Sequence, residues 1–175
     1  MEEHGRKLLA LVLTTLRETE EITRTTMART LLEADLVHYE AWKRSLSGEL
    51  YDRALVGPVP QGLEKVLEDG EAGEILQAGR GQDGALCYRP GTHFPLKLAE
   101  AQELLTPEEL DSLTAALGLV RSLSPEELSR RGKGLAAWRL GTGPLSVAAL
   151  ACASEEELFA LADRLWNAGG SREAR

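Results

Sequence analysis

The chain of 175 residues has room for one ordinary domain, because a single hydrophobic core usually extends over roughly 100 to 200 residues. Hydrophobic residues make up 43% of it and charged residues 27%, a composition that favours a packed core over intrinsic disorder. The 28 acidic residues outnumber the 20 basic ones, so the net charge is -8 and the molecule as a whole repels nucleic acids and anionic membrane surfaces.

Two amphipathic helices are expected at the start of the chain. Leucines and a valine between Leu8 and Leu16 recur with helical spacing and predict a first helix that ends near Glu18. Thr23 is suited to cap a second helix that runs to about Arg44. The apolar stripe of this second helix passes through Met27, Leu31, Asp35, His38, Tyr39 and Trp42. Polar atoms therefore lie on a face that we expect to be buried.

A proline-containing bend follows the second helix. Residues 51–56 are expected to be extended, and they lead into Gly57-Pro58-Val59-Pro60. Each proline restricts the residue before it to extended conformations, so the chain cannot be helical there. We expect Pro60 to occupy the first turn of a third helix that ends at Gly70.

The second half of the chain contains a predicted β-hairpin and three similar helix starts. Residues 74–78 and 85–89 flank a glycine-rich loop and predict the hairpin, which an extra strand over 145–150 could extend. Thr106, Ser124 and Ser154 each precede acidic residues in the pattern of a capping box. The sequence therefore predicts a mainly helical α+β single domain over residues 1–168, with six or seven helices, one small β-hairpin and a tail over 169–175.

No complete catalytic, metal or cofactor motif emerges from the sequence. Gly79, Gly81 and Gly84 match the dinucleotide pattern GxGxxG, but a strand follows them where that motif requires a helix. Asp35 and His38 can share a helix face, but zinc requires three or four protein ligands. We expect no cofactor. The two cysteines, Cys87 and Cys152, are too few for a disulfide framework and favour a reducing cytoplasm.

Two groups of polar residues could mark a contact surface. If the side chains of Asp35, His38 and Tyr39 are buried, each one without a partner costs about 1 to 3 kcal/mol. We expect Tyr51 and the backbone of the Gly57 to Pro60 segment to be their partners. Residues 121–139 carry a local excess of +3, which could form a partner surface. The alternative is that Arg130 and Arg131 end a helix before Gly132.

The order of these motifs resembles the Panacea antitoxin domain, a family that includes SocA-like antitoxins and phage-associated bacterial proteins. The resemblance rests on Leu31 to Tyr39, on Ser47-Gly48 with Tyr51, on Gly57 to Pro60 and on Ala137-Trp138, and it covers roughly residues 6–150. A Ser/Thr-His pair that is usual before the tryptophan is missing around residues 131–135.

The resemblance implies a protein without enzymatic activity that binds and neutralises a cognate protein toxin. In the SocA-like case it also delivers the toxin to a protease. Its contact surface would be built on the following residues: Asp35, His38, Tyr39, Tyr51, Gly57, Pro58, Pro60, Arg131 and Trp138.

Two other functions remain open from the sequence. Residues 22–44 and the predicted hairpin could form a winged-helix-like DNA-binding regulator, although residues 1–53 hold 8 basic and 10 acidic side chains. A small hydrolase could use Asp35 and His38. We expect a cytoplasmic protein with a toxin as its partner, with nucleic acid unlikely, with no membrane contact and with homo-oligomers possible.

Overall fold

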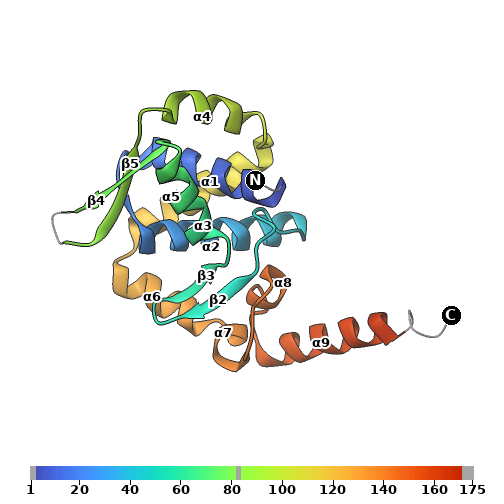
Figure 1. The fold of residues 1–175 in the computed structure, drawn as a ribbon. Helices are drawn as coiled ribbons and strands as arrows, with labels where there is room; N and C mark the ends of the chain where they lie inside the picture. Colours follow the sequence, from blue (N-terminus) through green and yellow to red (C-terminus); the bar gives the residue numbers. More distant parts are fainter. Residues whose placement is uncertain (1–2, 82–83, 171–175) are drawn as a thin grey trace.

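Helices α1 and α2 form the centre of the molecule. The structure is a computed structural model that describes residues 3–81 and 84–170 (Figure 1). It confirms the mainly helical α+β class. Helix α1 (Glu3–Thr19) and helix α2 (Arg24–Trp42) confirm the first two predicted helices. The Thr23 Oγ1 accepts a hydrogen bond from the Thr26 N–H at 3.1 Å, as expected of a cap.

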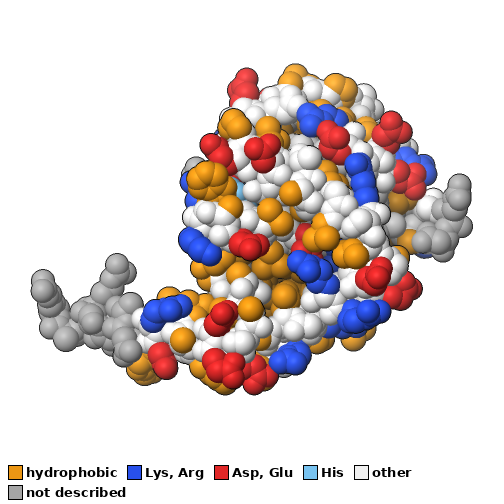
Figure 2. All heavy atoms as spheres, turned by 180° about the vertical axis from the view of Figure 1, so that it is seen from behind, with side chains coloured by type: hydrophobic (Ala, Val, Ile, Leu, Met, Phe, Trp, Pro, Cys, Tyr) orange, Lys and Arg blue, Asp and Glu red, His pale blue; other side chains and the backbone are white. Residues whose placement is uncertain are grey.

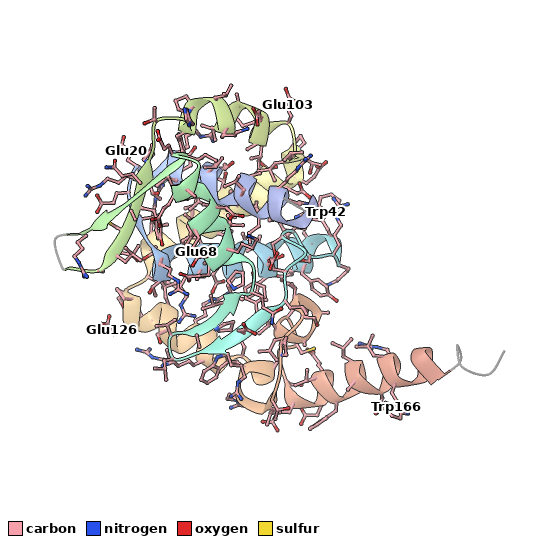
Figure 3. The ribbon with its side chains drawn as sticks, viewed as in Figure 1. Glu20, Trp42, Glu68, Glu103, Glu126 and Trp166 are labelled. Atoms are coloured by element: carbon pink, nitrogen blue, oxygen red, sulfur yellow. The ribbon has the colours of Figure 1, made fainter. Side chains whose placement is uncertain are left out.

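Helix α2 is more deeply buried than its pattern predicts. Every residue from Met27 to Asp35 is buried, because α1, α5 (Pro107–Ser122) and strand β3 (Gly57–Pro60) all pack against this helix. Trp42, at the end of the predicted stripe, is 51% exposed (Figure 3). The inner part of α2 therefore has to accommodate polar side chains in the interior.

A three-stranded antiparallel sheet covers one end of this helical core. The strands β1 (Ile22–Thr23), β4 (Leu76–Arg80) and β5 (Leu86–Pro90) are arranged in the order β1-β5-β4. Strands β4 and β5 confirm the predicted hairpin, with boundaries shifted by one or two residues. The short strand β1 was not predicted, because two residues carry too little periodicity to be recognised.

The proline bend is itself a β-hairpin. Strand β2 (Tyr51–Ala54) pairs antiparallel with β3 (Gly57–Pro60), so that Tyr51 lies opposite Pro60. The prediction that Pro60 begins a helix is therefore wrong, since α3 (Leu63–Ala72) starts three residues later. Two-stranded sheets tolerate proline because each strand has a free edge where no N–H is required.

The remaining helices pack around the helical core or project from it (Figure 1). They are α4 (Phe94–Gln102), α5, α6 (Pro125–Gly134), α7 (Ala136–Leu140), α8 (Val147–Leu150) and α9 (Glu155–Gly170). The described residues thus form nine helices, more than the six or seven expected.

The expected capping boxes are largely confirmed, whereas the expected extra strand is wrong. Complete boxes occur at Thr106 and Ser124. Ser154 Oγ accepts from the Glu157 N–H, but the Glu157 carboxylate accepts from Ala153 instead of from Ser154. Residues 147–150 form helix α8, because Ser146 caps them, and only Leu145 pairs with Tyr51 as an isolated bridge.

Helix α9 projects away from the rest of the molecule (Figure 1). It continues to Gly170, two residues into the expected tail, and residues 171–175 lie outside the described part of the chain. Within the described residues, no helix combines the length and the apolar character that a membrane span requires.

Candidate functional site

The carboxylate of Asp35 organises the loop that follows α2. Asp35 is fully buried. Its Oδ1 accepts hydrogen bonds from the Ser45 hydroxyl at 2.8 Å and from the N–H groups of Leu46 at 2.7 Å and Ser47 at 3.0 Å. Its Oδ2 accepts from the hydroxyls of Ser47 and Tyr51, the latter at 2.6 Å. Five donors thus converge on one buried charge.

Tyr51 connects this network to the β2–β3 hairpin. Its side chain is fully buried, and burial together with the neighbouring Asp35 charge raises the pKa of its phenol well above the ordinary value. Its backbone forms two hydrogen bonds with Leu145, both at 2.8 Å, and it lies opposite Pro60 in the hairpin. The predicted contact between Asp35 and Tyr51 is confirmed, and it fixes the base of the hairpin to α2.

His38 and Tyr39 do not join this network. His38 is fully buried, and its Nδ1 lies 3.0 Å from the Ser112 hydroxyl on α5. Burial lowers the pKa of this imidazole despite the nearby Glu109 carboxylate. Tyr39 is half-buried, with the Lys43 ammonium 5.9 Å from its ring centre. The expectation that all three side chains fix the proline bend is wrong, because one helical turn carries each of them to a different neighbour.

Arg131 lies in the last turn of α6, as the helix-end alternative expected, and it also pairs with a buried acid. Helix α6 continues past Gly132 to Gly134, so the predicted helix end before Gly132 is wrong. The Arg131 Nε donates to the Glu33 Oε1 at 2.7 Å. Glu33 is 2% exposed and its Oε2 has no partner within the described residues. This hydrogen bond raises the pKa of Arg131. It also connects α6 to α2.

A buried arginine, Arg29, lies beside this ion pair, and the sequence analysis missed it. Arg29 is 4% exposed, and its Nη1 and Nη2 have no hydrogen-bond acceptor within the described residues. Burial lowers the pKa of its guanidinium, an effect that the Glu33 charge opposes. The only sequence signal is the Arg29–Glu33 spacing of four residues on α2, which exposed helix faces also show.

Two glycines, Gly57 and Gly132, leave the space that the Arg29 guanidinium occupies. Gly57 has a φ of +110°, and a Cβ atom there would lie 2.4 Å from the Arg29 Nη1. A Cβ atom on Gly132 would lie 2.3 Å from the same nitrogen. Pro58, next in the hairpin, is buried beside Gly132. The turn at Gly57 thus favours glycine through its positive φ, and a side chain there would also displace the Arg29 guanidinium.

The tip of the β2–β3 hairpin is apolar and exposed. Leu55 is 92% exposed and Val56 is 39% exposed. Beside Val56, a cleft of about 310 Å³ opens between the hairpin, α2, α5 and α6. We call this cleft the tip cleft; its apolar lining consists of Val56, Val120, Leu123, Pro125 and Leu128.

Trp138 borders the hairpin on its other side. The Arg53 guanidinium lies 5.0 Å from the centre of the Trp138 ring and donates to the Gly141 carbonyl at 2.6 Å. The indole Nε1 is buried and has no acceptor within the described residues. Trp138 therefore holds β2 against α7, and it is half-buried rather than presented on the surface.

Other features of the described residues add little chemistry. No group of three or more His, Cys, Asp or Glu side chains close enough to hold a metal ion occurs in residues 3–81 and 84–170. Comparison of the chain with protein families, with curated proteins and with solved structures finds no match.

Proposed function

We propose that the chain is a cytoplasmic, non-enzymatic binding protein of the antitoxin type, which neutralises a cognate protein toxin by direct contact. One observation carries the proposal: Leu55, a large apolar side chain, is 92% exposed at the tip of a hairpin whose base is fixed by buried hydrogen bonds. The resemblance of the surrounding motifs to the Panacea domain supports the same function.

The rigidity of the hairpin base favours binding. A surface that is already ordered loses little conformational entropy when a partner docks. A few well-packed residues near the centre of an interface carry most of the binding energy. With Asp35, Tyr51 and the prolines holding its base, the tip presents Leu55 and Val56 in one geometry, next to the tip cleft.

Co-expression tests this function. The chain is produced together with the product of the adjacent gene, because toxin and antitoxin are usually encoded side by side. We expect the adjacent product alone to arrest growth, and the chain to restore growth and to co-purify with it. Absence of both rescue and complex contradicts the proposal.

Helix α9 offers a second surface for the adapter version of this function. Its side chains Phe159, Leu165 and Trp166 are 61%, 64% and 83% exposed, and Figure 2 shows hydrophobic side chains along this projecting helix. We propose that a protease contacts α9 while the toxin occupies the hairpin tip. Trp166→Ala should then preserve growth rescue and slow degradation of the toxin, whereas unchanged degradation contradicts the adapter role.

The element order favours a second candidate, the DNA-binding regulator. Helices α1, α2 and α3 with the sheet order β1-β5-β4 resemble a winged helix, in which the third helix enters the DNA groove. However, α3 carries four acidic side chains and one lysine, which repel phosphates. Glu68 of α3, labelled in Figure 3, is exposed. An electrophoretic mobility-shift assay with the DNA upstream of the gene, repeated at rising salt concentration, separates the two functions. We expect the chain not to shift the DNA. A shift that weakens as the salt concentration rises would favour the DNA-binding regulator.

A further inference from the structure

The tip cleft contains a buried positive charge that lacks a full counter-charge. Arg29 lines the cleft and is 4% exposed. A guanidinium keeps its proton at every physiological pH, so burial cannot neutralise it. Its nearest acid, Glu33, already receives the hydrogen bond of Arg131 at 2.7 Å. Two arginines thus share one carboxylate, and the group retains one net positive charge.

The Arg29 nitrogens Nη1 and Nη2 are available to a ligand that enters the cleft if the side chain rotates. These two nitrogens have no acceptor within the described residues, and they lie in the space left by Gly57 and Gly132. Nη1 and Nη2 make no hydrogen bonds in that space. A rotation of the Arg29 side chain toward the cleft would therefore not break any hydrogen bond of these two nitrogens. Buried charges in proteins are normally paired, so a carboxylate that met these nitrogens would supply the missing interaction.

The lining of the cleft defines the rest of the ligand. Val56, Val120, Leu123 and Leu128 provide apolar walls, and the hydroxyl-bearing Thr25 and Ser129 lie at the cleft as well. The volume of about 310 Å³ is at the lower end of the range for small-molecule sites, which is roughly 300 to 1,000 Å³. Such a site suits a short apolar chain that ends in one charged group.

We propose that the tip cleft binds a small monocarboxylic acid with an apolar body, and that Arg29 pairs with its carboxylate. The same chemistry is present at the C-terminus of a peptide that ends in leucine. The inference goes beyond the proposed function and does not depend on it, because the isolated chain should bind the acid with no protein partner present.

Calorimetric titration of the full chain tests the site. The probes are hexanoate, hexanamide, inorganic sulfate and a tripeptide that ends in a free-carboxylate leucine. We expect saturable 1:1 binding of hexanoate and at least tenfold weaker binding of hexanamide and of sulfate. Binding of the tripeptide more tightly than hexanoate would identify a peptide terminus as the source of the carboxylate, and weaker binding would identify a free acid.

Two variants locate the binding at Arg29. Arg29→Met keeps an unbranched apolar side chain without the charge and should weaken hexanoate binding at least tenfold. Arg130→Met removes an exposed arginine from the same region of α6 and should leave binding unchanged.

The hexanamide comparison uses the unaltered protein, so the proposal remains testable if Arg29→Met does not fold. No saturable binding of hexanoate, equal binding of hexanamide or sulfate, or unchanged affinity in folded Arg29→Met would each overturn the proposal.

Discussion

At the residue scale, the polar side chains of α2 determine how the neighbouring segments are held. Asp35 receives five hydrogen bonds, three of them from hydroxyl groups. Hydrogen bonds to a charged group contribute about 1.5 to 3 kcal/mol each. The carboxylate therefore replaces the hydration that it loses on burial, and it orders the loop and the hairpin base at the same time.

Substitution of Asp35 measures this contribution. An Asn side chain has the same shape as Asp, but its amide nitrogen is a hydrogen-bond donor where the carboxylate oxygen is an acceptor. The amide nitrogen would therefore face the hydroxyl or N–H donors that now bind that oxygen. We expect Asp35→Asn to lower the free energy of unfolding by about 3 kcal/mol, measured by urea denaturation. Asp52 is exposed and accepts a single hydrogen bond from Gln61, so the control Asp52→Asn should change the value by less than about 0.5 kcal/mol. Equal effects of the two variants would contradict the role of Asp35.

His38 makes stability depend on pH. Burial lowers its pKa from the ordinary value of 6.5, so the unfolded chain binds a proton more readily than the folded one. Its contribution is complete above pH 6.5 and is lost as the pH falls through the lowered folded value. The free energy of unfolding should therefore decrease between pH 7.5 and 5.5 more steeply in the unaltered protein than in His38→Gln.

An exposed histidine provides the control for this comparison. His93 lies on the surface, so His93→Gln makes the same substitution away from the buried site and gives the reference slope for His38→Gln. A slope that is the same in His38→Gln and in the unaltered protein would show that His38 does not titrate differently on folding.

At the element scale, the β2–β3 hairpin depends on Gly57. Its positive φ of +110° disfavours any side chain, and a Cβ atom there would displace the Arg29 guanidinium. Gly57→Ala should destabilise the protein by about 1 to 3 kcal/mol, since strained backbone conformations have costs of this order.

Gly118 provides a matched control because a Cβ atom there would have no neighbour within 4 Å. It lies inside α5, where alanine is favoured over glycine, so Gly118→Ala should stabilise the protein by about 0.5 to 1 kcal/mol. Thermal unfolding of the two variants gives the comparison, and a stabilised Gly57→Ala would contradict the packing of Arg29 against the hairpin.

The predictability of the elements depended on whether their signals were local. The cap at Thr23 and the boxes at Thr106 and Ser124 use groups within four residues of each other, and they were predicted correctly. Residues 147–150 were misassigned because β-branched and apolar residues in a short run do not distinguish a strand from a helix. Pro60 was misassigned because its strand partner, Tyr51, lies nine residues earlier in the chain.

At the scale of the whole molecule, the candidate site combines predicted and unpredicted residues. The contact of Asp35 with Tyr51 followed from the need to satisfy buried polar atoms. The pairing of Arg131 with Glu33 spans 98 residues, and the burial of Arg29 depends on the distant Gly132. Such pairs are set by the packing of α6 on α2, and no periodicity in the sequence encodes them.

The acidic surface and the exposed apolar tip also belong to this scale. Glu20, Glu103 and Glu126 lie around the periphery in Figure 3, consistent with the net charge of -8. Leu55, at 92%, is the most exposed of the large hydrophobic side chains among the described residues, and its exposure suits a contact with a partner. The proposed function therefore places the hairpin tip at the centre of the partner interface.

The affinity for the adjacent-gene product tests this claim most directly. Calorimetry would compare the unaltered chain with Leu55→Asp and with Leu96→Asp, a control on α4, where Leu96 is 62% exposed. A residue at the centre of an interface contributes at least about 2 kcal/mol, so Leu55→Asp should weaken binding by about 30-fold or more while Leu96→Asp leaves the dissociation constant unchanged. Equal affinities of the Leu55→Asp variant and the unaltered chain would contradict the account.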